Sequence, residues 1–169
     1  MEVLQPRVDA NEINILDTLY LSGWTKLKAK DCVSTFFDHQ LQTVDAVISA
    51  NDMIAESLHE YFEEKGLSGI VVTGLDADVK ACLRIAEKKQ TMTVMLETKK
   101  IADCVANTAL FLASKNGKYI SGYTVTNESL TNDIKGKSIQ LESQVIDADN
   151  VQEKVAEHKI FPLSWFENS

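Results

Sequence analysis

Polar side chains stand at the ends of three consecutive apolar segments of this sequence. Asn51 and Asp52 end one segment, Asp76 ends the next, and Tyr20 ends an earlier one. An amide and a carboxylate can each engage neighbouring hydroxyl groups of a polyol through two atoms, and an aromatic ring can cover the C–H face of a sugar. These residue types therefore indicate a half-site for a polyol. Asn51, Asp52 and Asp76 are also suited to cap the helices that follow them, so capping stays open as the alternative.

The segments around these side chains alternate between strand and helix patterns. Strands are expected at 12–19, 44–50, 70–73 and 91–96, and helices at 25–41, 53–65, 77–89 and 99–114. This alternation predicts a three-layer α/β fold, with a parallel sheet flanked by helices on both faces. Open α/β sheets bind ligands outside the carboxyl ends of their strands, where the polar residues stand. The near-continuous apolar run at 44–50 is typical of a strand buried on both faces.

The pattern changes beyond residue 118. Extended segments are expected at 119–126 and 137–146, with a polar loop at 127–136 between them. Asn150 and Glu153 have the spacing of a capping box before a helix at 151–158. The aromatic tail from Phe161 is expected to pack across a neighbouring surface.

Composition excludes several classes of function. The 169 residues carry a net charge of -8, which disfavours nucleic acid as a partner because its phosphates would be repelled. No apolar run approaches the ~18–20 residues that span a bilayer, and the first residues lack the pattern of a signal peptide. The three cysteines are widely spaced and are expected to be buried thiols. The three histidines are scattered and no nucleotide-binding motif is present, so we expect neither a metal nor a cofactor.

One enzymatic alternative starts from the stretch DADV, which begins at Asp76. It superficially resembles the DxDx(T/V) nucleophile motif of phosphatases of the haloacid dehalogenase type, in which an Asp forms an acyl-phosphate. Gly74 and Leu75 are expected to interrupt the preceding strand, and no downstream acidic pair is suited to hold a metal. We therefore expect no enzyme.

Several motifs together carry a family resemblance. They read ISAND up to Asp52, KGLSG from Lys65, VTGLDAD up to Asp78, and RIAEKKQTMTV from Arg84, with SGW ending at Trp24. The combination resembles the carboxyl-terminal half of xylose-type monosaccharide-binding proteins, the solute receptors of ABC sugar importers with a type I periplasmic-binding-protein fold. The similarity covers most of the chain and fades after residue 116.

The resemblance implies a division of the chain. Residues 1–96 would form the α/β core of a second lobe, 97–118 a helix that belongs to the first lobe, and 119–169 the hinge-return strands with the C-terminal helix and tail. The rest of the first lobe has no counterpart here, nor does the first strand of the second lobe. Sugar would be held in the cleft between two lobes.

The resemblance also assigns roles to single residues. Asn51 matches the sugar-binding amide, Asp76 the sugar-binding aspartate, and Tyr20 the stacking tryptophan, while Asp52, Asp78 and Trp24 are weaker candidates. Two polar contacts of the family are replaced by Leu75 and Leu96.

Two functions follow as expectations. The first is non-enzymatic binding of a xylose-like pentose by a truncated substrate-binding component of an ABC uptake or sensing system, with an importer membrane subunit and a complementing first lobe as partners. The second is a degenerate sensory or interaction lobe that contacts a sensor kinase or a like lobe, such as a second copy of itself, without strong sugar binding. The resemblance implies an extracytoplasmic location; the absence of a signal peptide implies a cytoplasmic one if the chain is the full gene product.

Overall fold

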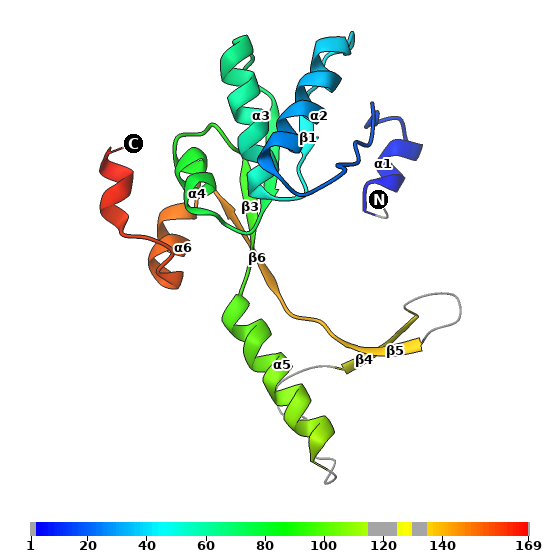
Figure 1. Cartoon of the computed structure of the whole chain (residues 1–169), viewed down its shortest axis with the longest axis vertical. Helices are drawn as coiled ribbons and strands as arrows, with labels where there is room; N and C mark the ends of the chain where they lie inside the picture. Colours follow the sequence, from blue (N-terminus) through cyan, green and yellow to red (C-terminus); the bar gives the residue numbers. More distant parts are fainter. Residues whose placement is uncertain (1–2, 115–124, 130–134, 169) are drawn as a thin grey trace. The chain divides into compact units, whose positions relative to one another are not determined.

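The computed structural model describes residues 3–114, 125–129 and 135–168 (Figure 1). Helices and strands alternate through most of the chain, as the sequence predicts. The elements are α1 (Gln5–Asp9), α2 (Lys26–His39), β1 (Ala46–Ile48), α3 (Asp52–Lys65), β2 (Val71–Leu75), α4 (Val79–Ala86), β3 (Met92–Leu96), α5 (Thr98–Ala113), β4 (Val125–Ser129), β5 (Lys135–Ile139), β6 (Ser143–Asp147), α6 (Val151–His158) and the 3-10 helix η1 (Leu163–Asn168).

The main sheet has four strands in the order β1-β2-β3-β6. β1 and β2 are parallel, and Val47 lies opposite Val72. β4 and β5 form a separate antiparallel pair. The chain divides into two compact units, residues 1–93 with 146–169 and residues 94–145, which are described separately.

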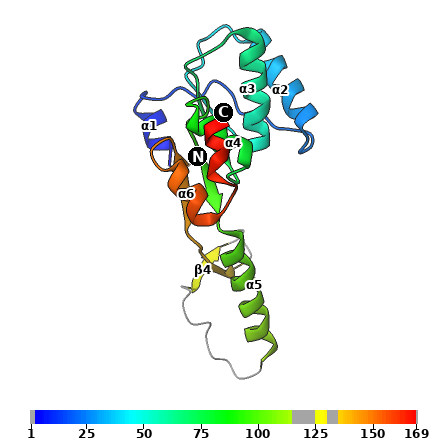
Figure 2. The ribbon, with the colours of Figure 1, turned by 90° about the vertical axis from the view of Figure 1, so that its left-hand side faces the viewer.

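The core of the first unit lies between the sheet and two helices, α2 and α3, which lie side by side (Figure 2). Apolar residues recur at three- and four-residue steps along both helices, so each helix presents one apolar stripe. The buried cluster contains Val33, Ala55, Leu58, Tyr61, Phe62 and Val72, with Phe37, Val47 and Ile70 packed against it. Burial of this cluster holds the two helices on the sheet.

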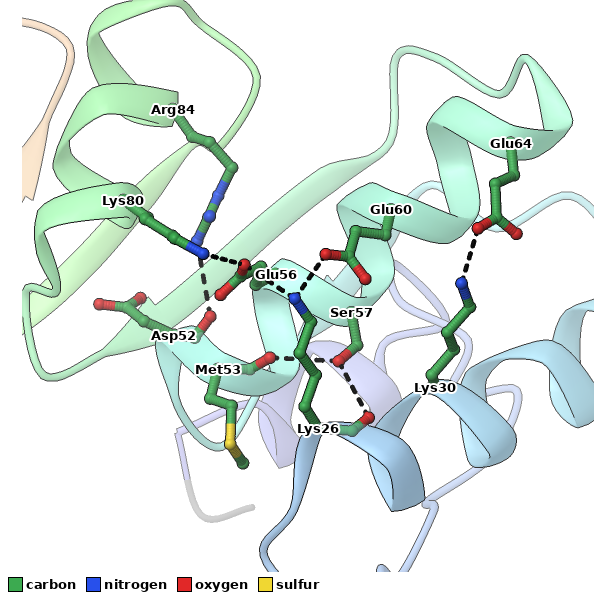
Figure 3. Close-up of polar contacts among 10 residues, drawn as sticks. All are labelled: Lys26, Lys30, Asp52, Met53, Glu56, Ser57, Glu60, Glu64, Lys80 and Arg84. Carbon is green, nitrogen blue, oxygen red and sulfur yellow. Dashed lines mark hydrogen bonds and ion pairs between the residues drawn. The ribbon is translucent and has the colours of Figure 1, made fainter.

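Ion pairs join the outer sides of α2 and α3 (Figure 3). Lys26 Nζ lies 2.9 Å from Glu56 Oε1 and 2.5 Å from Glu60 Oε1, and Lys30 Nζ lies 2.6 Å from Glu64 Oε1. These side chains remain partly exposed, and pairs of this kind contribute roughly 0–1 kcal/mol each. The apolar cluster therefore dominates the packing of the two helices.

The helix ends show which side chains act as caps. Thr25 caps α2, and Gly66 closes α3 in the left-handed conformation with φ +67. The capping box expected before α6 is wrong: Asn150 makes no side-chain cap hydrogen bond to that helix. Its Oδ1 instead accepts a hydrogen bond from the Asp147 N–H at 3.1 Å, which closes the turn after β6.

The prediction fails at two places near the sheet edge. Residues 12–19 form no strand, although their pattern favours one, because a strand needs a paired neighbour. β1 is shorter than expected and is not buried on both faces, since Ile48 is 70% exposed. β1 is one of the two edge strands of the sheet, and its face opposite α2 and α3 is uncovered at Ala46 and Ile48.

Two further boundaries differ from the prediction. β2 continues through Gly74 and Leu75, which were expected to interrupt it. The polar loop expected at 127–136 overlaps β4 and β5, while 119–124 and 130–134 lie outside the described residues. The tail folds as η1 against α6, and Phe161 is buried and stacks with Trp165 at 5.6 Å between ring centroids.

Candidate functional site

Asn51 stands between β1 and α3 and caps that helix. Its Oδ1 accepts a hydrogen bond from the Ile54 N–H at 3.0 Å. The capping alternative is therefore realised for this residue. The cap uses only the oxygen of the amide, so the Nδ2 group, which is a donor, is not engaged by it. Asn51 is half-buried, and capping and ligand contact are compatible roles for its two ends.

Asp52, the next residue, points into the protein. It is 1% exposed and its carboxylate accepts three hydrogen bonds. The donors are the Asp78 N–H at 2.9 Å, the Thr93 hydroxyl at 2.9 Å and the Gln90 side-chain amide at 3.0 Å. Burial raises the pKa of Asp52, and the three donors oppose that shift. We therefore place this weaker sugar-binding candidate inside the structure, where a ligand cannot reach it.

The surroundings of Asp52 are completed by Gly74, Arg84, Gln90 and Thr93. A Cβ at Gly74 would overlap Asp52 Oδ1, so the carboxylate lies close against the backbone of β2. Arg84 Nε donates to Gln90 Oε1 at 3.1 Å. Arg84 Nη2 also donates to the Asp52 carbonyl at 3.5 Å, as Figure 3 shows. Gln90 and Thr93 join this cluster without a sequence motif that predicts it. Their only signal is that two polar side chains flank the start of an apolar strand.

The turn after β2 carries Asp76, which the family resemblance assigns as the sugar-binding aspartate. Asp76 is exposed, with φ +107, and Ala77 follows with φ +56. The Ala77 N–H donates to Thr93 Oγ1 at 3.3 Å, and the Asp78 N–H donates to Asp52. Partial desolvation of its carboxylate, followed by the nearby negative charge of Asp78, raises the pKa of Asp76. Asp78 is exposed and makes no side-chain cap hydrogen bond to α4.

The two aromatic candidates lie in the segment before α2. Tyr20 is 89% exposed and Trp24 is 68% exposed. Tyr20 lines an open concavity of about 840 Å³ between residues 16–22 and the outer face of α2. Neither Asn51 nor Asp76 is among the described residues that line it. The hydrogen bond between Asp52 and the Asp78 N–H thus links the ends of β1 and β2. Tyr20 lines a concavity to which Asn51 and Asp76 do not contribute.

The two apolar departures from the family pattern end β2 and β3. Leu75 is half-buried, and Leu96 is 40% exposed. Neither can supply a hydrogen bond from its side chain.

In the part of the chain that the structure describes, no group of three or more His, Cys, Asp or Glu side chains could hold a metal ion. None of its helices is long and apolar enough to cross a membrane. The cysteines of this part are free thiols, with Cys82 and Cys104 buried.

Curated relatives share the sequence at moderate identity. The D-xylose-binding periplasmic protein of Haemophilus influenzae is 31% identical over 157 residues, which cover 92% of this chain and 46% of that protein. The protein of the same name from Escherichia coli is 31% identical over 131 residues, covering 77% of this chain and 39% of that protein. The chain therefore spans less than half the length of these two relatives.

Solved structures share the fold. An ABC transporter solute-binding protein from Clostridium phytofermentans, with bound β-D-glucose, superposes with a TM-score of 0.78 at 19% identity, over 98% of this chain and 53% of that one. A carbohydrate transporter solute-binding protein from Chloroflexus aurantiacus, in complex with D-glucose, gives a TM-score of 0.73 at 17% identity, over 96% and 54%. The α/β fold is thus that of about half of a type I periplasmic binding protein. The sequence model of the family described as "Periplasmic binding protein domain" matches residues 1–118, and the chain belongs to this periplasmic binding protein family.

Proposed function

We propose that this chain binds a monosaccharide, a xylose-like pentose, without chemical conversion, as the second-lobe part of a solute-binding component. The observation that carries the proposal is the arrangement at the ends of β1 and β2. Asn51 presents an amide there and Asp76 an exposed carboxylate, and both follow strands of one parallel pair. The names of the two curated relatives supply the class of ligand.

The chemistry of the two side chains suits a polyol. A carboxylate accepts two hydrogen bonds from vicinal hydroxyl groups, and such charge-assisted bonds are shorter and stronger than neutral ones. The amide Nδ2 of Asn51 donates to a third hydroxyl. Tyr20 enters the proposal as a stacking ring through the family resemblance alone, since it lines a hollow to which Asn51 and Asp76 do not contribute. Asp78 and Trp24 are proposed as secondary contacts. Because Leu75 and Leu96 replace polar residues of the family, affinity is expected to be weaker than in a full receptor.

The wider assignment follows the family. Residues 1–96 would be second-lobe core, 97–118 a helix of the first lobe, and 119–169 the hinge return and tail. A complementing first lobe would close the cleft over the sugar, and an ABC importer membrane subunit would take the loaded protein. An extracytoplasmic location belongs to the same proposal.

A second candidate function is a lobe that serves sensing or interaction, with a sensor kinase, a second copy or a first lobe as partner. The uncovered edge strand β1 favours it, since Ile48 is 70% exposed there. Exposed apolar strand edges readily pair with another chain. The apolar side chains at Leu75 and Leu96 favour it as well, because they weaken the sugar site.

A thermal melt with and without millimolar xylose, ribose, arabinose, glucose or galactose tests the first function. A ligand that binds only the folded state raises the melting temperature by mass action. We expect a sugar-specific rise that Asp76→Asn abolishes. Asp149→Asn, which removes the same charge from an exposed residue beyond β6, is the matched control and should keep the rise. A folded protein that responds to none of the five sugars would refute autonomous sugar binding, and its mass by light scattering would then test the interaction function.

A further inference from the structure

We propose that Asp52 and Thr93 are positioning residues that hold the backbone of the Asp76–Ala77–Asp78 turn and thereby fix the Asp76 carboxylate relative to Asn51. The inference rests on the proposed function for its ligand, but the clamp itself concerns only this chain. It gives Asp52 a role different from the direct sugar contact expected from the sequence.

The turn is held at two successive backbone amides. The Ala77 N–H donates to Thr93 Oγ1 at 3.3 Å, and the Asp78 N–H donates to Asp52 Oδ2 at 2.9 Å. The Thr93 hydroxyl in turn donates to that same Oδ2 at 2.9 Å. One hydroxyl and one carboxylate oxygen therefore organise both amides that directly follow Asp76.

The turn needs such support because its backbone is strained. Asp76 and Ala77 both have positive φ, at +107 and +56, although neither is glycine. Residues that carry a side chain adopt such angles only at a cost in free energy, and surrounding contacts must hold them there. Without the two hydrogen bonds the turn would relax and the Asp76 carboxylate would lose its fixed direction.

The carboxylate of the clamp is itself rigidly held. Asp52 is 1% exposed, Thr93 is fully buried, and Gln90, 1% exposed, donates to Asp52 Oδ1 at 3.0 Å. Gly74 leaves the space that the carboxylate occupies. Asp52 is also the first residue of α3, directly after the cap residue Asn51, so a movement of Asp52 would shift the start of the helix. The same residue thus ties the Asn51 end of the site to the Asp76 end.

Thr93→Val and Thr93→Ser form a matched pair to test the clamp. Valine keeps the shape and removes the hydroxyl, whereas serine keeps the hydroxyl and removes a methyl group. Amide hydrogen exchange by NMR measures how well the backbone amides of the turn are protected, and it needs no ligand. We expect exchange at Ala77 and Asp78 to rise about tenfold in Thr93→Val and to change much less in Thr93→Ser, relative to core amides such as those of Leu58 and Val72. Equal acceleration at all amides, or none at the turn, would overturn the clamp.

Sugar titration of the same variants tests the consequence for binding. We expect Thr93→Val to weaken xylose binding about tenfold at a temperature where it is fully folded, and Thr93→Ser to retain most of the affinity. Faster exchange at the turn with unchanged affinity would show that the clamp does not position the ligand group. If the unaltered protein binds no sugar, the proposed function fails, while the exchange experiment still decides the clamp.

A milder variant covers the case in which Thr93→Val does not fold. Arg84 Nε orients Gln90 through the hydrogen bond at 3.1 Å, and Arg84 is only partly buried. Arg84→Met should raise exchange at Asp78 several-fold through the loosened Gln90. No local change at Asp78 in this variant would contradict the clamp.

Discussion

Gly74 lies directly against the carboxylate of Asp52, in a position where a side-chain Cβ would overlap Asp52 Oδ1. The glycine near the end of β2 is therefore required by a close approach and not by an unusual backbone angle. It allows the buried carboxylate to reach the Asp78 N–H of the following turn.

Gly74→Ala should destabilise the protein by about 3 kcal/mol, because overpacking displaces a carboxylate that accepts buried hydrogen bonds. Urea unfolding followed by circular dichroism measures the change. Gly23→Ala is the control, since no atom beyond its two chain neighbours lies within 4 Å of a Cβ built there. That control should stay within about 0.5 kcal/mol of the unaltered protein. Equal free energies of unfolding for the two variants would contradict the close approach.

Asn51→Asp should separate capping from ligand binding. An aspartate keeps the oxygen that caps α3, so the melting temperature without sugar should change little. It replaces the amide donor by a second acceptor, so the rise in melting temperature with xylose should be lost. Asn51→Ala should lose the sugar response together with about 1 kcal/mol of stability. A full sugar response in Asn51→Asp would remove the amide from the proposed contacts.

His59 should make the protein sensitive to mild acid. Burial lowers its pKa from 6.5 to about 4, and the nearby Arg84 and Lys89 add to the shift. Below pH 6.5 the unfolded chain takes up a proton at this histidine while the folded protein does not, so stability falls as the pH falls toward 4. The loss is up to roughly 3 kcal/mol for a shift of this size.

His59→Leu, which carries no titrating group, isolates this effect. Chemical unfolding at pH 7, 5.5 and 4.5 should give a difference between the two proteins that changes in favour of the variant as the pH falls. Asp52 acts in the opposite direction because its pKa is raised, but it is present in both proteins and cancels in the comparison. A difference that stays constant over this range would show that His59 is not held neutral.

The packing of α2 on α3 should depend on apolar contacts far more than on ion pairs. Leu58→Ala should cost about 2–5 kcal/mol, because Leu58 is 2% exposed in the centre of the cluster. Lys26→Met, which removes both ion pairs of a side chain that is 42% exposed, should cost less than about 1 kcal/mol. Both values can be measured by urea unfolding at low and high salt. A larger loss in Lys26→Met than in Leu58→Ala would reverse this ranking.

Periodicity predicted the helices well because it depends on local spacing. The apolar steps along 25–41 and 53–65 gave α2 and α3 to within a few residues. Residues 12–19 have an equally clear strand pattern, but strand formation depends on a neighbour in space, and they form none. Whether a strand is buried on both faces likewise depends on other elements packed against it in space, so the apolar pattern of 44–50 did not predict the exposed face of β1.

The candidate site shows a second limit of sequence reasoning. Asn51 and Asp52 are adjacent and chemically similar, yet one stands half-buried at the surface and the other is 1% exposed. Which of two neighbours points inward at the start of a helix depends on partners far along the chain. For Asp52 these partners are Gln90 and Thr93, 38 and 41 residues away.

The left-handed backbone at Asp76 and Ala77 brings thermal stability into conflict with ligand binding. Glycine adopts such angles without strain, so laboratory evolution that rewards heat resistance alone should enrich glycine at both positions. At residue 77 that exchange would be harmless to recognition, whereas at residue 76 it would delete the carboxylate proposed to hold the sugar. If aspartate persists at residue 76 while residue 77 changes to glycine, ligand binding is therefore the property under selection at residue 76.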